Sequence, residues 1–292
     1  MNKIIITGGN GQLSYDLKKL REINNIDLVF FSKEALDITD YKKSLEIIKD
    51  IKPELIINTA AYTFVDKAEE NKKKAFDTNV IGAKNLSIIC SDLRIRLIHI
   101  STDYVFDGTK KFPYDETDKP NPLNYYGQTK LEGEQIILKH HFDSTIIRAG
   151  WLFGYYGNNF VKTIINLSKK KKVIQVVNDQ IGIPTPTSCF ANDLMEISEK
   201  LINFSHDSLN GIFHYACSPD TTWFSFANKI IDIYYKNNQS NKPKIIPVKT
   251  DEYKFLAKRP KYTVMNSNKI CDKFELSVNK WEKELYTLVN KL

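Results

Sequence analysis

The sequence predicts an α/β fold, in which a doubly wound parallel sheet carries a smaller, interleaved C-terminal lobe. Three observations support this prediction. The first 150 residues contain five short runs that are almost continuously apolar, and longer stretches with helical spacing separate them. Strands of that kind, alternating with helices, form parallel sheets covered on both faces. A glycine-rich segment also lies between the first apolar run and the first helical stretch, which is typical of the Rossmann type.

The expected elements follow one another regularly only in the first half. Strands are predicted at 3–7, 27–31, 54–60, 96–101 and 145–149, and helices at 12–21, 41–50, 72–93 and 125–140. In the second half, strands are predicted at 173–177 and 211–215, helices at 191–201 and 222–234, and the Lys- and Pro-rich stretch 240–262 receives no assignment. We expect a Rossmann domain over 1–150 and mainly the smaller lobe over 151–292. Because the two interleave, one boundary near residue 150 is a simplification.

Composition argues against several classes of protein. Hydrophobic residues make up 42% of the 292 residues, which is enough for a sizeable core. However, no apolar run approaches the roughly 20 residues that span a bilayer. Only three isoleucines precede the first glycines, which is too short an apolar region for a signal peptide. We therefore expect a cytoplasmic protein without a membrane partner.

Metals and nucleic acids are not expected as partners either. The four cysteines form no C-x-x-C pair, and the five histidines show no metal-ligand spacing. The net charge of +7 would suit nucleic-acid binding. Yet the lysines are scattered among acidic residues, and their densest run, 169–172, is typical of a solvated helix end. A mildly positive field would also suit an anionic cofactor and substrate.

The segment 7–14, T-G-G-N-G-Q-L-S, is the candidate cofactor-binding turn. Glycines such as Gly8 and Gly11 let the backbone approach a pyrophosphate, and the helix that follows offers free N–H groups. A bare turn is the alternative interpretation. Ser14 stands where the third glycine of the pattern normally permits close packing of helix on strand, and we expect the fold to tolerate it.

The end of the second strand bears on the choice of cofactor. Sites for NAD usually carry an acidic side chain there, which binds the ribose 2′-hydroxyl. Here the strand runs into Ser32 and Lys33, which could accept the 2′-phosphate of NADPH without repulsion. NADPH is therefore the expected cofactor and NADH the alternative, although Lys33 could simply be exposed.

Tyr126 and Lys130 form the candidate chemical pair, because side chains at i and i+4 share one face of a helix. A nearby ammonium group should lower the pKa of the phenol, so that it can transfer a proton near neutral pH. Tyr15 and Lys19 repeat the spacing, but a packing or solvated face of the first helix explains them. Thr102 ends the fourth strand, where ligands gather, and its hydroxyl could bind the same substrate oxygen; a helix cap is the alternative.

In this order, these features resemble the extended short-chain dehydrogenase/reductase superfamily, and more narrowly the dTDP-4-dehydrorhamnose reductases. The resemblance runs nearly end to end. It rests on I-T-G-G-N-G-Q-L (6–13), L-D-I-T-D (36–40), N-T-A-A-Y-T-x-V-D-K-A-E (58–69), S-T-D-Y-V-F-D-G (101–108), N-P-x-N-Y-Y-G-x-T-K-x-x-G-E (121–134), R-A-G-W-L-F-G (148–154), D-Q-I-G-x-P-T (179–185) and R-P (259–260). The fourth and seventh of these blocks are far more specific than the superfamily signature.

The resemblance implies a role for each matching residue. The catalytic set would be Thr102, Tyr126 and Lys130. The full cofactor-binding set, with the residues reasoned above, is Gly8, Gly11, Gln12, Leu13, Ser32, Asp37, Ile38, Ala61, Tyr62, Thr63, Tyr126 and Lys130. The substrate would meet Thr102, Asp103, Tyr104, Trp151 and Arg259. Aromatic core is the alternative for Tyr104 and Trp151, and a surface salt bridge is the alternative for Arg259.

The implied reaction is the NADPH-dependent reduction of the C4 keto group of dTDP-4-dehydro-L-rhamnose to dTDP-L-rhamnose, and the C-terminal lobe would bind this substrate. Two other functions remain open: a nucleotide-sugar epimerase or dehydratase with bound NAD, and a non-catalytic NADP-binding regulatory subunit resembling that of methionine adenosyltransferase. Some family members carry an acidic metal ligand just after the I-G-x-P-T turn, where this chain has Ser188. We therefore expect no metal, and either a monomer or a homodimer.

Overall fold

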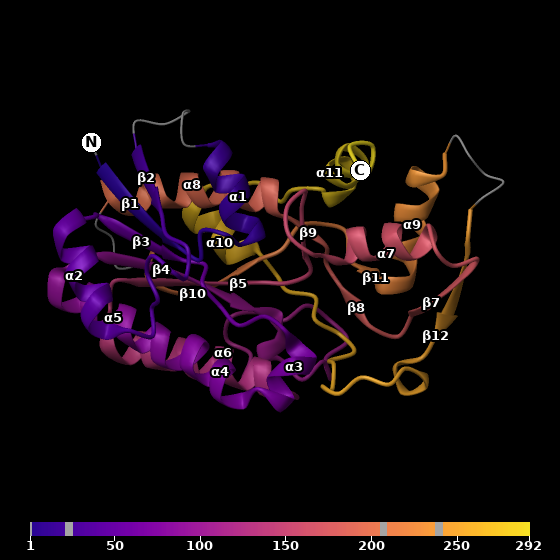
Figure 1. Cartoon of the computed structure of the whole chain (residues 1–292), viewed down its shortest axis with the longest axis horizontal. Helices are drawn as coiled ribbons and strands as arrows, with labels where there is room; N and C mark the ends of the chain where they lie inside the picture. The colour runs from indigo at the N-terminus through magenta and orange to yellow at the C-terminus, as the bar shows by residue number, and fades with distance from the viewer. Residues whose placement is uncertain (1, 21–25, 205–208, 237–241) are drawn as a thin grey trace.

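The computed structural model of the chain describes residues 2–20, 26–204, 209–236 and 242–292. Its centre is a six-stranded parallel sheet in the order β10-β5-β4-β3-β1-β2 (Figure 1). The strands are β1 (Asn2–Thr7), β2 (Ile26–Phe30), β3 (Leu55–Asn58), β4 (Arg96–Thr102), β5 (Ser144–Ala149) and β10 (Gly211–Tyr215). All six were predicted from the sequence, and the doubly wound parallel sheet is confirmed.

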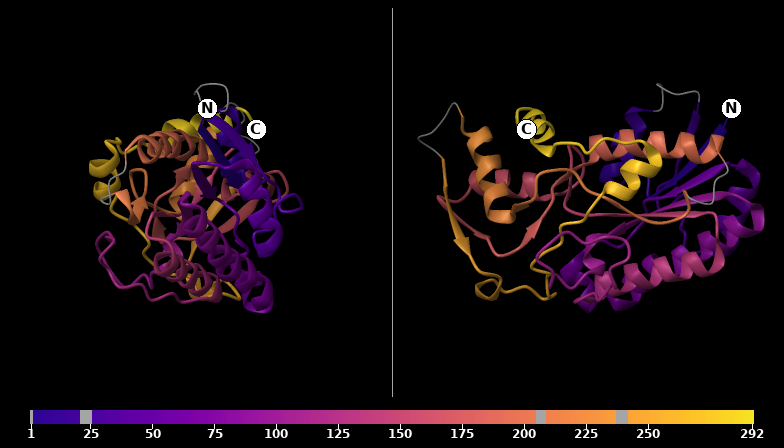
Figure 2. Two further views of the ribbon diagram at one scale, coloured as in Figure 1. Left: turned by 90° about the vertical axis from the view of Figure 1, so that its left-hand side faces the viewer. Right: turned by 180° about the vertical axis from the view of Figure 1, so that it is seen from behind.

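Helices cover both faces of this sheet (Figures 1 and 2). One face carries α2 (Tyr41–Ile51), α4 (Lys72–Phe76), α5 (Gly82–Leu93) and α6 (Tyr125–His140); the other carries α1 (Gln12–Lys19), α8 (Thr187–Asn203) and α10 (Asn268–Phe274). The predicted helix 72–93 is helical over its whole length, but a π-helical turn, Asp77–Ile81, joins the α-helical segments α4 and α5. The last residue of the predicted helix 12–21, like residues 240 and 241, lies outside the described residues.

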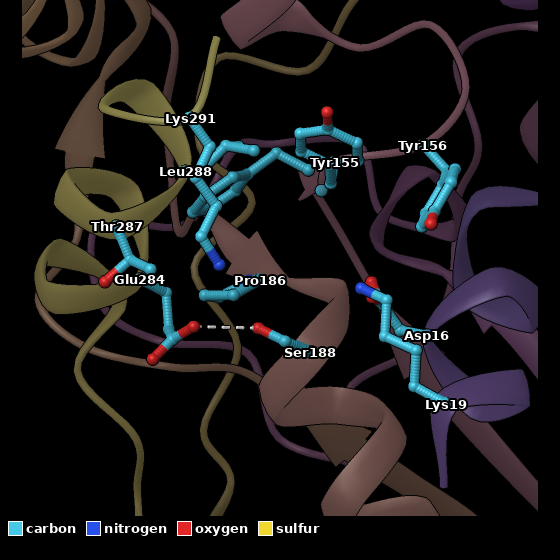
Figure 3. A pocket seen from close by; sticks show the side chains of 12 residues that line it. Asp16, Lys19, Tyr155, Tyr156, Pro186, Ser188, Glu284, Thr287, Leu288 and Lys291 are labelled. Carbon is cyan, nitrogen blue, oxygen red and sulfur yellow. Dashed lines mark hydrogen bonds and ion pairs between the residues drawn. The ribbon is translucent and has the colours of Figure 1, made fainter. Parts of the chain in front are cut away.

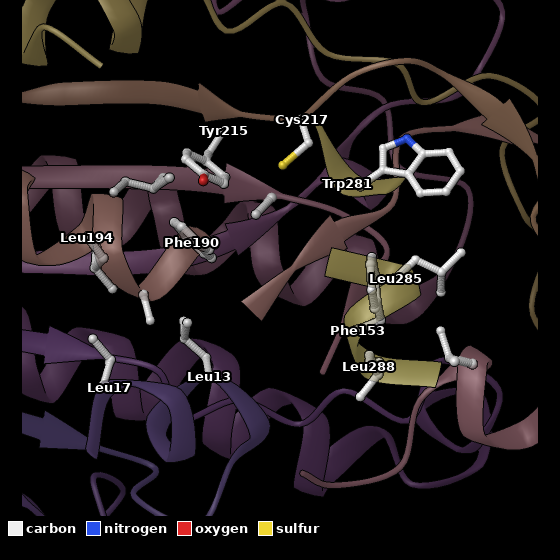
Figure 4. Packing of buried hydrophobic residues seen from close by; sticks show 14 of the residues in the cluster. Leu13, Leu17, Phe153, Phe190, Leu194, Tyr215, Cys217, Trp281, Leu285 and Leu288 are labelled. Atoms are coloured by element: carbon white, nitrogen blue, oxygen red, sulfur yellow. The ribbon is translucent and has the colours of Figure 1, made fainter. Parts of the chain in front are cut away.

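Strand side chains alternate between two apolar cores, as the period of two residues requires. Ile4 and Ile6 belong to a core that also contains Leu17 of α1 and Leu194 of α8. Figure 4 shows part of this core. Ile5 faces the opposite way and packs into a second core with Ile48 of α2. Both faces of every central strand are therefore buried, which explains the nearly continuous apolar runs in the sequence.

A smaller group of elements lies beside the sheet, on the right in Figure 1. It contains three short strand pairs and three helices: β6 (Leu152–Phe153) with β9 (Thr185–Pro186), β7 (Val173–Val177) with β12 (Lys244–Val248), β8 (Ile181–Gly182) with β11 (Thr221–Thr222), and α7 (Phe160–Ser168), α9 (Trp223–Tyr234) and α11 (Trp281–Val289). The strand β10 belongs to the large sheet and α8 packs on it, although both come from the second half of the chain. The chain therefore passes between the two parts more than once. The boundary near residue 150 stays a prediction.

Candidate active site

A cleft of about 400 Å³ opens at the carboxyl ends of the central strands. The predicted site residues that line it are Gly11, Gln12, Leu13, Ala61, Thr63, Thr102, Asp103, Tyr104, Tyr126, Lys130 and Trp151. A cavity of about 260 Å³ adjoins the cleft, since both are lined by Gly11 and Ala61, and it brings in Gly8, Asp37 and Ile38. A third cavity, of about 350 Å³, meets the cleft at Tyr104 and contains Arg259. Of the predicted site residues, Ser32 and Tyr62 line none of these cavities.

The glycine-rich turn has the geometry of a phosphate cradle. Gly8 has a φ of 65°, and a Cβ there would lie 2.8 Å from the backbone of Ala60. Gly11 precedes α1 and no side chain caps this helix, so the first N–H groups of the helix remain open to a ligand. Ser14 is accommodated without exposure: its hydroxyl donates to the Gly8 carbonyl at 3.1 Å and lies 3.0 Å from the hydroxyl of Thr59. The turn therefore fits an anionic pyrophosphate.

The adjoining cavity carries charges of both signs. Lys33 and Asp37 line it, with 3.9 Å between Nζ and Oδ2, and Glu34 lines it as well. The Ser32 hydroxyl interacts with Glu34 and lowers the pKa of this exposed carboxyl. Sequence reasoning missed Glu34, although it directly follows the Ser-Lys pair on which the choice of cofactor was argued. Because Glu34 is also present, the charges of this cavity alone do not decide between NADPH, which carries a 2′-phosphate on its ribose, and NADH, which does not.

The catalytic pair is held in place by close backbone approaches around the start of α6. Asn124 caps the helix by accepting a hydrogen bond from the Gly127 N–H at 2.8 Å. A Cβ at Gly127 would lie 2.2 Å from the Tyr104 carbonyl, so glycine allows α6 to press against the 3₁₀ turn Asp103–Val105. This turn follows Thr102 at the end of β4, which brings the Thr102 hydroxyl and the Tyr126 phenol to the same cleft.

Burial dominates the protonation of the pair. Tyr126 is 8% exposed, and burial raises the pKa of its phenol, an effect that the nearby Thr102 hydroxyl partly offsets. The expectation that Lys130 lowers the phenol pKa is wrong for this structure. Burial is the largest cause of the shift, and Lys130 is not among the groups that shift this pKa; its Nζ instead donates to the Ile100 carbonyl at 2.8 Å and lies 3.1 Å from Nε2 of His99. Burial lowers the pKa of Lys130 to about 8, which Glu134 partly opposes.

Asp103 carries an unusual carboxyl group. It is 2% exposed, and burial raises its pKa to about 6. Thr102 donates to Oδ1 at 3.1 Å, whereas Oδ2 has no partner within hydrogen-bonding distance. The hydroxyl of Thr263 is near enough to lower the pKa somewhat, but it too lacks a hydrogen-bond partner. The residue Asp103 lines the cleft, but its Oδ2 atom is itself buried and is left as an acceptor without a donor.

The opposite wall of the cleft is aromatic. Trp151 has a φ of 51° and stacks on Trp223, with ring centroids 3.4 Å apart and an angle of 6° between the planes. A Cβ at Gly182 would come within 2.4 Å of the Trp151 ring, so the indole is both packed and part of the cleft lining. Arg259 pairs with Asp66 at 2.5 Å and also lines the third cavity. Trp151 is thus packed and Arg259 is paired, and a contact of either side chain with the substrate stays a prediction.

A separate cavity of about 280 Å³ lies between α1, α8 and α11 (Figure 3). Ser188 lines it and donates to Glu284 at 3.0 Å, and Asp16 points in from α1, paired with Lys19 at 2.6 Å. Among the described residues, no three His, Cys, Asp or Glu side chains lie together in a group that could hold a metal ion, and no helix is both long and apolar enough to cross a bilayer. The absence of a metal from the working protein stays a prediction.

Comparisons with known proteins agree with this geometry. The sequence model of the family described as the RmlD substrate binding domain matches residues 1–292. A dTDP-4-dehydrorhamnose reductase of Aggregatibacter actinomycetemcomitans is 39% identical over 98% of this chain and 97% of its own length.

Two solved structures carry the same enzyme name. One, from Bacillus anthracis and in complex with NADP, is 39% identical with a TM-score of 0.90 and covers 100% of both chains. The other, from Clostridium acetobutylicum, is 36% identical with a TM-score of 0.91 and covers 99% of both chains.

Proposed function

This chain belongs to the RmlD substrate binding domain family of dTDP-4-dehydrorhamnose reductases, and we propose that it reduces the C4 keto group of dTDP-4-dehydro-L-rhamnose to give dTDP-L-rhamnose, using NADPH. One observation carries the proposal at the level of the site: Tyr126, Thr102 and Asp103 line one cleft beside the glycine turn. The Bacillus anthracis relative in complex with NADP supports the choice of cofactor.

The raised pKa of Tyr126 suits a proton donor. A reduction requires one hydride and one proton, and the bound nicotinamide supplies the hydride. Because burial keeps the phenol protonated at neutral pH, Tyr126 can give its proton to the carbonyl oxygen as negative charge develops there. Thr102 lies close enough to Tyr126 to hold the same oxygen in line. Lys130 would bind the nicotinamide ribose and stabilise the tyrosinate left behind.

The sugar and its diphosphate would occupy the aromatic side of the cleft. The indole of Trp151 offers an apolar face and one N–H donor to a sugar ring. Asp103 offers an acceptor to a sugar hydroxyl, and the guanidinium of Arg259, which lines the third cavity, offers donors to a phosphate. These residue roles are proposals, as is a cytoplasmic location.

Net consumption of NADPH tests the function. The protein should oxidise NADPH in proportion to dTDP-4-dehydro-L-rhamnose, which a spectrophotometric assay follows directly. An epimerase or dehydratase with bound NAD would turn over a sugar nucleotide without consuming NADPH, and a regulatory subunit would bind NADPH without turnover. Either result would contradict the proposal.

Tyr126→Phe tests the catalytic assignment. We expect kcat to fall by a factor on the order of 10² or more, as the loss of a general acid does, while the Kd of NADPH hardly changes. Tyr15→Phe is the matched control, because Tyr15 repeats the i, i+4 lysine spacing but stacks on Tyr156, with ring centroids 4.4 Å apart, outside the cleft. Near-normal turnover by the Tyr126→Phe variant would refute the role of this phenol.

A further inference from the structure

A buried row of polar side chains lies behind Lys130 and takes no part in the steps above. Thr7, Asn58 and His99 are register neighbours on the parallel strands β1, β3 and β4. Each is at most 1% exposed, as is Lys130 itself. The row ends where Nε2 of His99 lies 3.1 Å from Nζ of Lys130. Buried polar groups of this kind must share donors and acceptors consistently.

The orientation of the Asn58 amide follows from its neighbours. Its Oδ1 accepts from the backbone N–H of Ala60 at 3.2 Å and from the Thr7 hydroxyl at 2.7 Å. A backbone N–H can only donate, so this side of the amide must be the oxygen. The NH₂ group therefore faces Nδ1 of His99, at 2.9 Å, and donates to it. In a neutral imidazole that accepts at Nδ1, the proton is on Nε2.

This tautomer constrains the charge of Lys130. An Nε2–H group directed at Nζ needs an acceptor there, and an ammonium group has only donors. A neutral amine has one lone pair, so Lys130 can accept from His99 and still donate to the Ile100 carbonyl at 2.8 Å. Burial acts in the same direction, because it lowers the pKa of Lys130 to about 8 and the pKa of His99 well below 6.5.

We propose that Asn58 and His99 are positioning residues that stabilise the neutral amine of Lys130 in the cofactor-free protein, and that Lys130 takes up a proton from solvent when NADPH binds. The physical reason is that an anionic cofactor beside Lys130 favours the ammonium form, which then turns away from the imidazole. The row formed by Thr7, Asn58 and His99, called the relay below, thereby makes the positive charge of Lys130, close to Tyr126, depend on whether the cofactor is bound. The inference rests on the cofactor site proposed above.

The other ionisable groups around Lys130 leave this conclusion intact. Glu134, one turn further along α6, favours the ammonium form, but it is paired with Arg148 of β5 at 2.6 Å. Tyr126, on the same helix, keeps its proton because it is buried. Asp103, beyond Tyr126, is not among the charges that shift the pKa of Lys130.

Calorimetric titration with NADPH near pH 8, in buffers of different ionisation enthalpy, measures the proton uptake. Because the pKa of Lys130 is about 8, we expect the wild type to take up about half a proton per bound cofactor. His99→Gln should lose most of this uptake, because its amide oxygen can accept from both Asn58 and an ammonium group. His141→Gln is the matched control and should keep it, since His141 is another buried histidine but bonds only the Ile95 carbonyl.

Asn58→Asp tests the relay from its other end and serves if His99→Gln does not fold. A carboxylate accepts from Nδ1–H, which leaves Nε2 to accept from the ammonium form, so proton uptake should again be lost. Proton uptake equal to that of the wild type in either variant would overturn the inference, and so would its absence in the wild type. Failure of the wild type to bind NADPH would instead contradict the proposed cofactor site.

Discussion

Replacing Asp103 by asparagine should make the protein more stable and less active. At neutral pH this carboxyl is ionised in both the folded and the unfolded chain, but its pKa rises from 3.8 to about 6 on folding because it is buried. The difference means that the folded state disfavours the charge by roughly 3 kcal/mol, at about 1.4 kcal/mol per pH unit. Asparagine removes the charge, and its amide can donate to the hydroxyl oxygen of Thr263, which has no partner at present.

The pH dependence gives the sign of the effect. A carboxyl whose pKa is raised in the folded state contributes stability below pH 3.8 that is lost as the pH rises through about 6. Urea unfolding should therefore show the Asp103→Asn variant more stable than the wild type by about 1–3 kcal/mol at pH 7, with the advantage disappearing near pH 4. Lower stability of the variant at pH 7, or a difference that does not change with pH, would refute the reasoning.

A second aspartate provides a control of opposite sign. Hydrogen bonds from Asn121, Thr109 and Tyr114 hold the pKa of Asp107 below its usual value. Asp107→Asn should therefore destabilise the protein at neutral pH. Activity completes the test, because the carboxyl group of Asp103 is the proposed acceptor for a sugar hydroxyl. The stabilised Asp103→Asn variant should have a raised KM for the sugar nucleotide and an unchanged Kd for NADPH.

Two further predictions concern the adjoining cavity and the aromatic wall of the cleft. Lys33→Glu should weaken the binding of NADPH more than that of NADH, because only NADPH carries the 2′-phosphate; titration with both cofactors decides this, and equal losses would show that Lys33 does not contact the phosphate. Trp151→Leu should raise the KM for the sugar nucleotide and also cost on the order of 1–2 kcal/mol of stability, because the stacked pair with Trp223 is lost. A large fall in melting temperature with an unchanged KM would leave Trp151 a packing residue alone.

The strands and helices that the sequence predicts well are those with a continuous local signal. The helix α6 begins and ends at the predicted residues, since Asn124 caps it and helical spacing persists to its end. The third strand was predicted to reach residue 60 but ends at Asn58. There the Asn58 side chain accepts the N–H of Ala60 and turns the chain out of the sheet, a local competition that apolar periodicity does not reveal.

The features that the sequence does not predict depend on distant partners. The π-helical turn places Asn79 so that its amide accepts from the Tyr62 N–H at 2.8 Å and donates to Thr129 at 3.0 Å. Both partners are far away in the chain, so the sequence pattern of the helix itself does not predict the π-helical turn. The strand β12 pairs with β7 in the same way, across more than sixty residues, and its Lys and Pro side chains obscured it in the sequence.

For the candidate site, too, the sequence predicted the positions of the residues but not the properties that depend on distant partners. Motifs placed Thr102, Tyr126 and Lys130 together, and the structure brings all three to one cleft. Their protonation was not predictable, because it depends on burial and on which groups the strand register sets beside them. His99 is the clearest omission: it interrupts the apolar run at residues 97–100, L-I-H-I, and this was the available signal.

One face of α6 shows how the neighbouring strand residues determine the charge of Lys130. Tyr126, Lys130 and Glu134 follow one another at four-residue steps, so a phenol, an amine and a carboxylate line the same side of the helix. Were Glu134 alone, its buried charge would hold Lys130 as an ammonium group. Instead Arg148 of β5 binds both carboxylate oxygens and Ser101 of β4 donates to one. These contacts neutralise much of the negative charge of Glu134, so that it stabilises the ammonium form of Lys130 less. The amine can then respond to the cofactor, because the strong charges behind it already neutralise each other.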